Sequence, residues 1–367
     1  KKKNLCKTLL KTMCIVLGIL ILALLAYIVY LYASYYRIED NQELVVEAPV
    51  DDTTTGAAAV LATGTEYSAV TYNIGFGAYL PDYSFFMDGG TSSWAESPET
   101  VQYAINGAGE LVKSLDPDFA LIQEIDLDAT RSYHTDEYEM LRNILPEYTT
   151  VFAQNYDSAF LFYPFTQPHG SSRAGLGLFS KYPVSSALRR SFPISTSFSK
   201  FFDLDRCYSV SRIPVDNGKE LVIFNLHMSA YGNSDEIRKG QIEMLCNDMA
   251  KEYEAGNYVL CGGDFNHDLK ASEEDTEICE SWAFPFPRTE LPEHFAFCLD
   301  LLSSEEQAAL WNSARNADME YVPGVTYTVT LDGFIISDNI ECLSYENVNT
   351  GYSYSDHDPV KMEFVLK

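Results

Sequence analysis

Short apolar runs recur along the chain from residue 67 onward, separated by polar or turn-forming segments. Runs of this length that contain many β-branched and aromatic residues predict β-strands. Seven of them are YSAVTYN, FALIQE, AGLGLFS, LVIFNLH, NYVLCGGDF, LDGFIIS and KMEFVLK, at residues 67–73, 119–124, 174–180, 221–227, 257–265, 331–337 and 361–367. Several of these runs are apolar throughout, which indicates strands that are buried on both faces.

Two longer segments carry apolar residues at helical spacing instead. Ser97 followed by Pro98 is a typical helix start, and apolar residues follow at intervals of three and four as far as Leu115. A second helix is expected to begin near Asn233, with Glu236 three residues further on as in a capping box. Strands interleaved with helices predict an α/β sandwich in which helices cover packed sheets.

The N-terminal segment has a different pattern, because no charged residue occurs from Thr12 to Tyr36. A helix of this length rises about 37 Å, which is enough to cross a bilayer. Five lysines precede it, at positions 1, 2, 3, 7 and 11, whereas Arg37 is soon followed by acidic residues. The positive-inside rule therefore predicts a cytoplasmic N-terminus and an extracytoplasmic remainder.

These features predict four parts: a basic cytoplasmic tail at 1–11, a single-pass transmembrane signal anchor at 12–36, a linker or stalk at 37–66, and one catalytic domain at 67–367. A cleaved signal peptide is the alternative for the apolar segment. We favour the anchor because the run exceeds the roughly 7–15 apolar residues of a signal peptide, and no clear A-x-A cleavage site follows it. The protein is thus expected in the cell membrane.

The formal net charge is −28, and all 53 acidic residues follow Tyr36. Such a domain repels long polyanions and anionic lipid surfaces at a distance, and it attracts hydrated cations. Among the cysteines, Cys279 and Cys298 are the most plausible disulfide pair in an extracytoplasmic domain. Cys261, within an apolar run, is expected to be a buried free thiol.

Several predicted strands end in a polar residue that can bind metal or transfer protons. Asn73, Glu124, His227 and Asp264 end their strands, and Asn266 follows two residues after Asp264. If these strands lie side by side, their ends converge on one edge, where α/β proteins commonly place reactive groups. A single Asn or Asp at a strand end is more often a turn former, so the prediction depends on the whole set.

The C-terminal segment adds Asp332 in LDGFIIS, and Asp356 and His357 in SDHDP. In this order, the segments YNI, QE, NLH, GGDFN, LDGFIIS and SDHDP resemble the motif series of the endonuclease/exonuclease/phosphatase superfamily. The resemblance extends over 67–367. It implies a four-layer α/β/β/α sandwich, with two packed mixed sheets between helices, and a divalent-metal-dependent phosphoesterase activity.

The resemblance also implies a metal site. Glu124 resembles the principal ligand, with Asn73 supplying an amide oxygen and Asp356 close by. Mg²⁺ fits an all-oxygen site, because it is a hard ion that retains several waters and takes one or two carboxylates. Mn²⁺ or Ca²⁺ are possible alternatives for the same ligands.

The remaining motif residues resemble those that act on the phosphoryl group. Asp264 resembles the residue that positions or deprotonates the attacking water, and Asn266 its neighbour that hydrogen-bonds the phosphate. His357 is implied to stabilise the phosphoryl group, with Asp332 accepting a hydrogen bond from its other ring nitrogen. His227 resembles a second histidine that contacts the phosphate or assists the leaving group.

Two positions distinguish branches of the superfamily. Some branches have a tyrosine where His227 stands, and repair enzymes have an acidic residue where Gly75 stands. The chain is therefore more similar to the deoxyribonuclease and sphingomyelinase-like branches than to the apurinic-site repair branch. The departure at Gly75 leaves open whether one or two metals bind.

The expected substrate is a phosphodiester, either in nucleic acid or in a phospholipid-type or small head group, and no protein partner is predicted. Arg173 could reach a phosphate or pair with a carboxylate equally well. The remaining histidines fit no metal spacing and are expected in surface or loop positions: His134, His169, His267 and His294. The alternative from another class is a catalytically inactive envelope binding or scaffold domain that keeps the fold.

Overall fold

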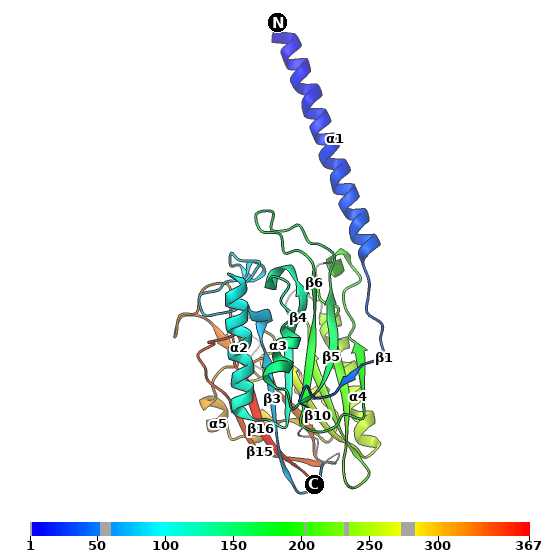
Figure 1. Ribbon diagram of the computed structural model, residues 1–367, viewed down its shortest axis with the longest axis vertical. Helices are drawn as coiled ribbons and strands as arrows, with labels where there is room; N and C mark the ends of the chain where they lie inside the picture. Colours follow the sequence, from blue (N-terminus) through cyan, green and yellow to red (C-terminus); the bar gives the residue numbers. More distant parts are fainter. Residues whose placement is uncertain (1, 52–59, 202, 231–234, 273–282) are drawn as a thin grey trace.

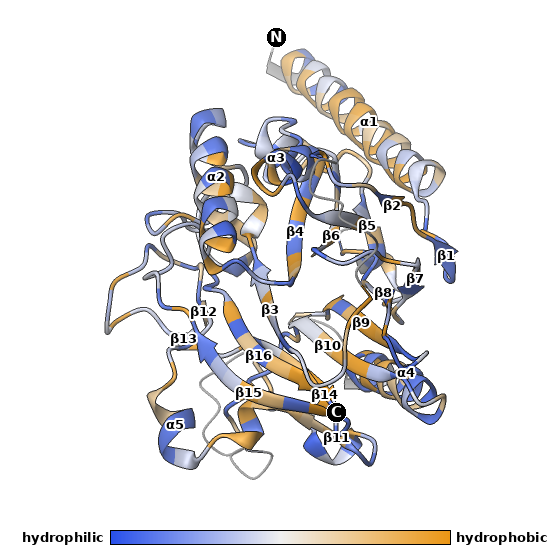
Figure 2. Ribbon diagram, turned by 60° about the horizontal axis from the view of Figure 1, so that its bottom comes forward, coloured by the Kyte–Doolittle hydropathy of each residue, from blue (hydrophilic) through white to orange (hydrophobic). Residues whose placement is uncertain are grey.

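The computed structural model describes residues 2–51, 60–201, 203–230, 235–272 and 283–367. Helix α1 (Lys2–Ser34) projects from one end of the domain, as Figure 1 shows, and its apolar residues run along most of its length in Figure 2. It is long and apolar enough to cross a membrane, a property that it shares with signal sequences. Only its C-terminal turns pack against the domain, around Leu31.

Two seven-stranded mixed sheets form the centre of the domain. Sheet I has the order β1-β7-β8-β9-β10-β14-β11, and sheet II has the order β15-β16-β3-β4-β6-β5-β2. The strands of sheet I are β1 (Gln42–Glu43), β7 (Ser186–Ser191), β8 (Cys207–Pro214), β9 (Glu220–His227), β10 (Tyr258–Asp264), β11 (Phe295–Phe297) and β14 (Asp332–Ser337). Those of sheet II are β2 (Val46–Glu47), β3 (Glu66–Asn73), β4 (Phe119–Ala129), β5 (Thr149–Asp157), β6 (Ser172–Ser180), β15 (Ile340–Asn347) and β16 (Val360–Leu366). A separate ribbon joins β12 (Ala314–Arg315) to β13 (Thr328–Val329).

Helices cover the outer faces of both sheets. They are α2 (Pro98–Leu115) and α3 (Glu137–Ile144) on sheet II and α4 (Asp235–Glu254) on sheet I. The short α5 (Ser304–Ala309) follows β11 in the chain. The predicted four-layer α/β/β/α sandwich is confirmed. The predicted cap of α2 is present, since the Ser97 side chain accepts a hydrogen bond from the Thr100 backbone. The expected start of α4 at Asn233 lies outside the described residues.

Alternation along β3 and β4 explains the two cores. Ala69 and Leu121 point between the sheets and join the large central core. Tyr72, three residues after Ala69, and Ile122, one residue after Leu121, face the other way and pack beneath α2 and α3. Because residues at every second position share a face, Asn73 at the end of β3 points toward the space between the sheets.

Part of the segment expected as a linker, 37–66, is integrated into the domain. β1 extends the edge of sheet I along β7, and β2 extends sheet II along β5. Leu61 is fully buried in the central core. Backbone hydrogen bonding to exposed edge strands accounts for this docking, which polar composition alone did not indicate.

The structure describes only one member of the expected Cys279–Cys298 disulfide. Cys298 and Cys261 are buried free thiols, the latter as expected. Cys279, the expected partner of Cys298, lies outside the described residues.

Candidate active site

Strand register in sheet I places three of the predicted site residues side by side. Asp264 ends β10, and its register partners are His227 at the end of β9 and Asp332 at the start of β14. All three side chains are buried, with exposures of 2%, 3% and 0%. The Nε2 atom of His227 lies 3.5 Å from Oδ2 of Asp264.

Asn73 connects sheet II to this cluster. Its Nδ2 donates to Glu124 Oε1 at 3.0 Å and to Asp264 Oδ2 at 3.1 Å. Its Oδ1 accepts a hydrogen bond from the backbone N–H of Gly75 at 3.0 Å. In this arrangement the amide nitrogen faces the two carboxylates and the amide oxygen faces the Gly75 backbone, so Asn73 links the two carboxylates.

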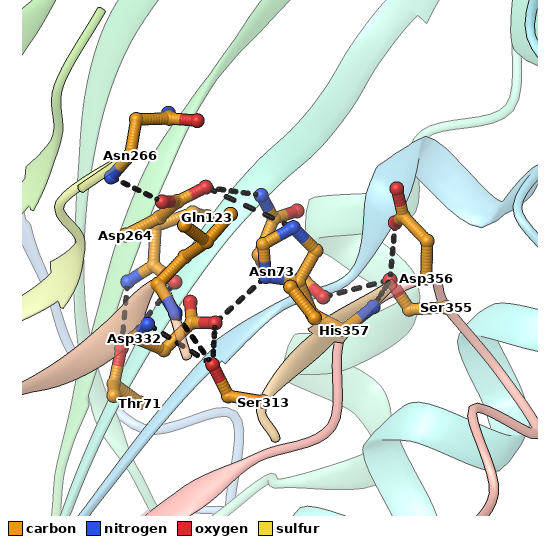
Figure 3. Close-up of polar contacts among 12 residues, drawn as sticks. Thr71, Asn73, Gln123, Asp264, Asn266, Ser313, Asp332, Ser355, Asp356 and His357 are labelled. Carbon is orange, nitrogen blue, oxygen red and sulfur yellow. Dashed lines mark hydrogen bonds and ion pairs between the residues drawn. The ribbon is translucent and has the colours of Figure 1, made fainter. Parts of the chain in front are cut away.

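His357 and Asp332 form the expected pair. Nδ1 of His357 lies 2.7 Å from Oδ2 of Asp332, which also accepts a hydrogen bond from the Ser313 hydroxyl at 2.7 Å. Figure 3 shows the ring of His357 between Asp332 and Asp264. Burial alone would lower the pKa of His357, but the negative charges of Asp332, Asp356 and Asp264 hold it well above its ordinary value.

The environment of Asp264 favours a proton acceptor near neutral pH. Burial, followed by the charge of Asp332, raises the pKa of Asp264 to about 7, although His357 opposes the rise. Oδ1 of Asp264 accepts a hydrogen bond from the backbone N–H of Asn266 at 2.8 Å, which fixes the carboxylate. His227 is the converse case, because burial and then Arg206 hold its pKa well below the usual value, so that it is neutral.

Two site residues have left-handed backbone conformations that non-glycine residues seldom adopt. Glu124 has φ of 56° and lies where the β4–β6 register shifts. Asn266 has φ of 50°, and its Nδ2 donates to the carbonyl of Met228 at 2.9 Å. Strain of this kind is commonly found at functional sites, where the surrounding structure imposes it to direct a side chain.

The carboxylates fit a divalent cation. Glu124 and Asp356 line the same cavity as Asp264. Burial raises the pKa of Asp356, and Glu124 adds to the rise while His357 and Arg315 oppose it. Burial, then Asp356 and Glu124, also raises the pKa of nearby Asp88 to about 7. A cation held by Glu124 and Asp356 would relieve this excess of negative charge.

A second set of possible ligand atoms comes from Asp264, Asp332 and His357, which lie within 4.8 Å of one another. Asp332 already accepts a hydrogen bond from the ring of His357, and a protonated imidazole does not bind metal.

Gly75 occupies a position where a side chain would not fit. Its φ is +54°, and a Cβ atom there would lie 2.7 Å from the Tyr79 ring and 3.1 Å from Oδ1 of Asp356. An acidic residue at this position would require the loop to move. The backbone conformation and the close contacts at position 75 therefore favour glycine over the acidic residue of the repair enzymes.

These residues line a cavity of about 380 Å³ that also contains three arginines. Arg131 is engaged by Asp126 at 2.8 Å, and Arg315 donates to three backbone carbonyls. Arg206 differs: it is 6% exposed, and its Nε and Nη1 have no hydrogen-bond partner among the described residues. It lies at the start of β8 beside the end of β9, so its charge is available to an anionic ligand next to His227.

Two of the histidines expected in surface or loop positions are buried, and one of them lines the cavity. His169 is buried, lines the cavity, and lies 6.2 Å from the ring of Phe85. Its expected loop position is correct, but it is not at the surface. His267 is also buried, with its Nδ1 at 2.6 Å from the carbonyl of Phe265. His169 has no neighbouring motif that could have revealed it, whereas His267 directly follows the GGDFN motif.

The remaining uncertain residues lie at the surface. Arg173 pairs with Asp128 at 3.2 Å, and both side chains are about half exposed, so the carboxylate alternative holds. His134 contacts the same Asp128, and His294 pairs with Asp338. These three do not line the cavity.

Residues 70–295 match the endonuclease/exonuclease/phosphatase family. The chain belongs to this family. Its members are metal-dependent hydrolases of phosphoesters, and the chain is an enzyme of this class. A search of curated proteins finds no match.

Solved structures agree on the fold. An endonuclease/exonuclease/phosphatase from Bacteroides vulgatus has 17% identity and a TM-score of 0.54, covering 83% of this chain and 100% of that one. Another from Beutenbergia cavernae has 16% identity and a TM-score of 0.54, covering 82% and 72%. The human Nocturnin catalytic domain with a bound sulfate anion has 14% identity and a TM-score of 0.53, covering 84% and 96%. At these identities the likeness establishes the fold alone.

Proposed function

We propose that this family member is a membrane-anchored phosphodiesterase whose catalysis depends on Mg²⁺ or a similar divalent ion. The observation that carries the proposal is the position of Asp264, which lies between neutral His227 and the charged His357–Asp332 pair. Glu124 and Asp356 line the same cavity. A proton acceptor, two imidazoles of different charge and a cation site are what hydrolysis of a phosphoester requires.

Each side chain has a role that follows from its contacts. Glu124 and Asp356 would hold the cation, which supplies charge neutralisation on the phosphoryl oxygens. Asp264 orients the attacking water and accepts its proton, since its pKa lies near neutrality. Asn73 keeps Asp264 and Glu124 at a fixed separation through its amide nitrogen.

Two histidines and the Asn266 amide would contact the substrate. His357 is held in one orientation by Asp332, and its charged ring stabilises negative charge on the phosphoryl group. Asn266 keeps one N–H for a phosphoryl oxygen, because its amide nitrogen donates the other to Met228. His227 is neutral and can donate a hydrogen bond from Nε2 to the leaving oxygen.

We further propose that α1 anchors the enzyme in the cell membrane with its N-terminus inside and the domain outside. The lysines before the apolar segment support this orientation. Proteinase added to intact cells should remove the domain, and protection of the domain would contradict the orientation.

Hydrolysis of bis(p-nitrophenyl) phosphate by the full chain in detergent tests the enzymatic proposal. The wild type should hydrolyse it with Mg²⁺ and stop when chelator is added. Asp264→Asn should lower kcat by at least about 10³-fold. Asp216→Asn, at an exposed turn beyond β8, is the matched control and should keep full activity. Absence of turnover in the wild type would favour the inactive scaffold, and turnover that survives chelator would contradict the dependence on a metal.

A further inference from the structure

The loop between β5 and β6, residues 158–171, lies at the same edge of the sandwich as the active site. β6 begins beside the end of β4, because Ser172 pairs with Ala129. β4 is parallel to β3, which ends at Asn73. In Figure 1 this loop and α1 both lie at the upper end of the domain. The anchor helix therefore leaves the domain from the edge that carries the site.

The loop contacts the last turns of α1 directly. The Tyr27 hydroxyl donates to the carbonyl of Phe160 at 3.2 Å, and the backbone N–H of Phe160 donates to the Tyr30 hydroxyl at 3.0 Å. The rings of Tyr27 and Phe162 lie 5.1 Å apart, edge to face. Tyr27 is seven residues before the end of α1 at Ser34, about 10 Å along the helix axis. The loop thus reaches well past the end of the helix toward its apolar middle.

A second segment joins the same contact. Phe201 packs with Leu31 and Leu161, and its ring lies 4.8 Å from that of Tyr32. The Lys200 ammonium lies 4.6 Å from the ring of Tyr35. Tyrosines and a lysine at the end of an apolar helix are the residues that occupy the head-group region of a bilayer.

The tip of the loop presents aromatic rings to the outside. Phe162, Tyr163 and Phe165 are 50%, 61% and 84% exposed. Three adjacent apolar rings at this exposure are costly in water, and they lie beside a helix that can span a membrane. A bilayer around α1 would cover them without any further protein.

The loop is also continuous with the wall of the active-site cavity. The ring of Tyr163 lies 5.9 Å from that of Phe86, which lies 6.0 Å from the ring of His169. His169 and the half-exposed Met87 line the cavity together with the site residues. An apolar path therefore leads from the exposed loop tip to the phosphoryl site.

We propose that loop 158–171 inserts its aromatic tip into the outer leaflet around α1, so that the cavity takes its phosphodiester from a lipid head group of that membrane. This inference rests on the proposed function and on retention of α1 in the bilayer. The net charge of −28 opposes an anionic surface, so the favoured lipid carries a zwitterionic head group.

Reconstitution of the full chain into lipid vesicles tests the inference. Vesicles of phosphatidylcholine should release diacylglycerol faster than vesicles of phosphatidylglycerol. A variant with Phe162→Ser, Tyr163→Ser and Phe165→Ser should slow lipid hydrolysis about tenfold or more, yet keep hydrolysis of soluble bis(p-nitrophenyl) phosphate. The matched control replaces two exposed leucines, Leu301→Ser and Leu343→Ser, and should not change either activity.

Insertion itself can be measured without turnover. Tryptophan placed by Phe165→Trp should be quenched by phosphatidylcholine with brominated acyl chains, relative to the three native tryptophans. Leu343→Trp on β15, near the opposite end of the domain in Figure 1, should not be quenched. Equal quenching at the two positions would contradict insertion of the loop.

The outcomes separate the two proposals. If the chain hydrolyses bis(p-nitrophenyl) phosphate but releases no diacylglycerol from either lipid, the lipid inference is wrong and the proposed function stands. The same conclusion follows if the loop variant hydrolyses vesicle lipid at the wild-type rate. Failure on the soluble diester as well would instead refute the proposed function.

Discussion

Two buried arginines near the start of β8 have opposite surroundings. Arg189 on β7 is fully buried, and each of its three guanidinium nitrogens donates a hydrogen bond, with acceptors that include the carbonyls of Gln154, Glu39 and Asp205. Arg206 is nearly as buried, but its Nε and Nη1 find no partner among the described residues. The guanidinium of Arg189 is therefore satisfied by the protein, whereas that of Arg206 has donors left for an anion.

The difference separates structural from functional burial of charge. Arg189 links the segment around Glu39 to the sandwich through a hydrogen bond. The hydrogen bonds of its guanidinium offset the free-energy cost of burying the charge. Arg206 leaves two buried nitrogens without a partner among the described residues, as expected of a site that binds an anion. Opposite responses to substitution should follow.

Arg189→Met should have the largest effect on folding. Removing the guanidinium leaves several buried carbonyls without donors, so the full chain should lose about 3–5 kcal/mol of stability. Denaturant unfolding measures this loss. The folded fraction should keep its activity on bis(p-nitrophenyl) phosphate, and a stable variant would mean that the Arg189 region does not secure the domain.

Arg206→Met should act on catalysis instead. We expect kcat/KM for a phosphodiester to fall about 10²-fold, or about 3 kcal/mol, while unfolding stability is unchanged or slightly raised. Steady-state kinetics and a melting curve on the same preparation test both halves. Lost stability with normal kcat/KM would reverse the roles assigned to the two arginines.

The free energy of unfolding should fall in acid, because His169 beside the site is buried. Burial lowers the pKa of His169 to about 3 from its ordinary 6.5. Below pH 6.5 the unfolded chain binds this proton and the folded chain does not, so stability falls as pH falls from about 6.5, by up to about 1.4 kcal/mol per unit. His169→Phe should flatten the decline between pH 6.5 and 5 in denaturant unfolding. An unchanged slope would show that His169 is protonated in the folded chain.

Arg173→Ala should have the smallest effect. Arg173 pairs with Asp128 at the surface, where such pairs contribute about 0–1 kcal/mol. The free energy of unfolding should fall by less than about 1 kcal/mol, and kcat should change less than about twofold. A loss comparable to that of Arg206→Met would place Arg173 on the substrate path after all.

Strand ends were predictable from the sequence because their pattern is local. Asp264 and His227 end apolar runs, Asp332 begins one, and sheet pairing aligns all three. The ordered motifs also predicted the His357–Asp332 pair. The orientation of the Asn73 amide was not predictable, because it depends on the backbone N–H of Gly75.

Other features depend on long-range packing and leave no local signal. Arg189 lies in SALRRS, whose charges suggest a surface strand, and only docking of the chain near Glu39 buries it. Arg206 and His169 become site residues through the shape of the cavity. Loop 158–171 contains aromatic residues like many surface loops, and only its position beside α1 indicates that these residues could contact a membrane.

The central claim is that one cation site, held by Glu124, serves the Asp264 cluster. The most direct test measures how the hydrolysis rate depends on Mg²⁺ concentration in the wild type and in Glu124→Gln. We expect no hydrolysis of bis(p-nitrophenyl) phosphate without metal, and a half-saturating Mg²⁺ concentration raised about tenfold or more in the variant, because a charged oxygen ligand is lost. Identical Mg²⁺ curves for the two proteins, or full activity in chelator, would contradict it.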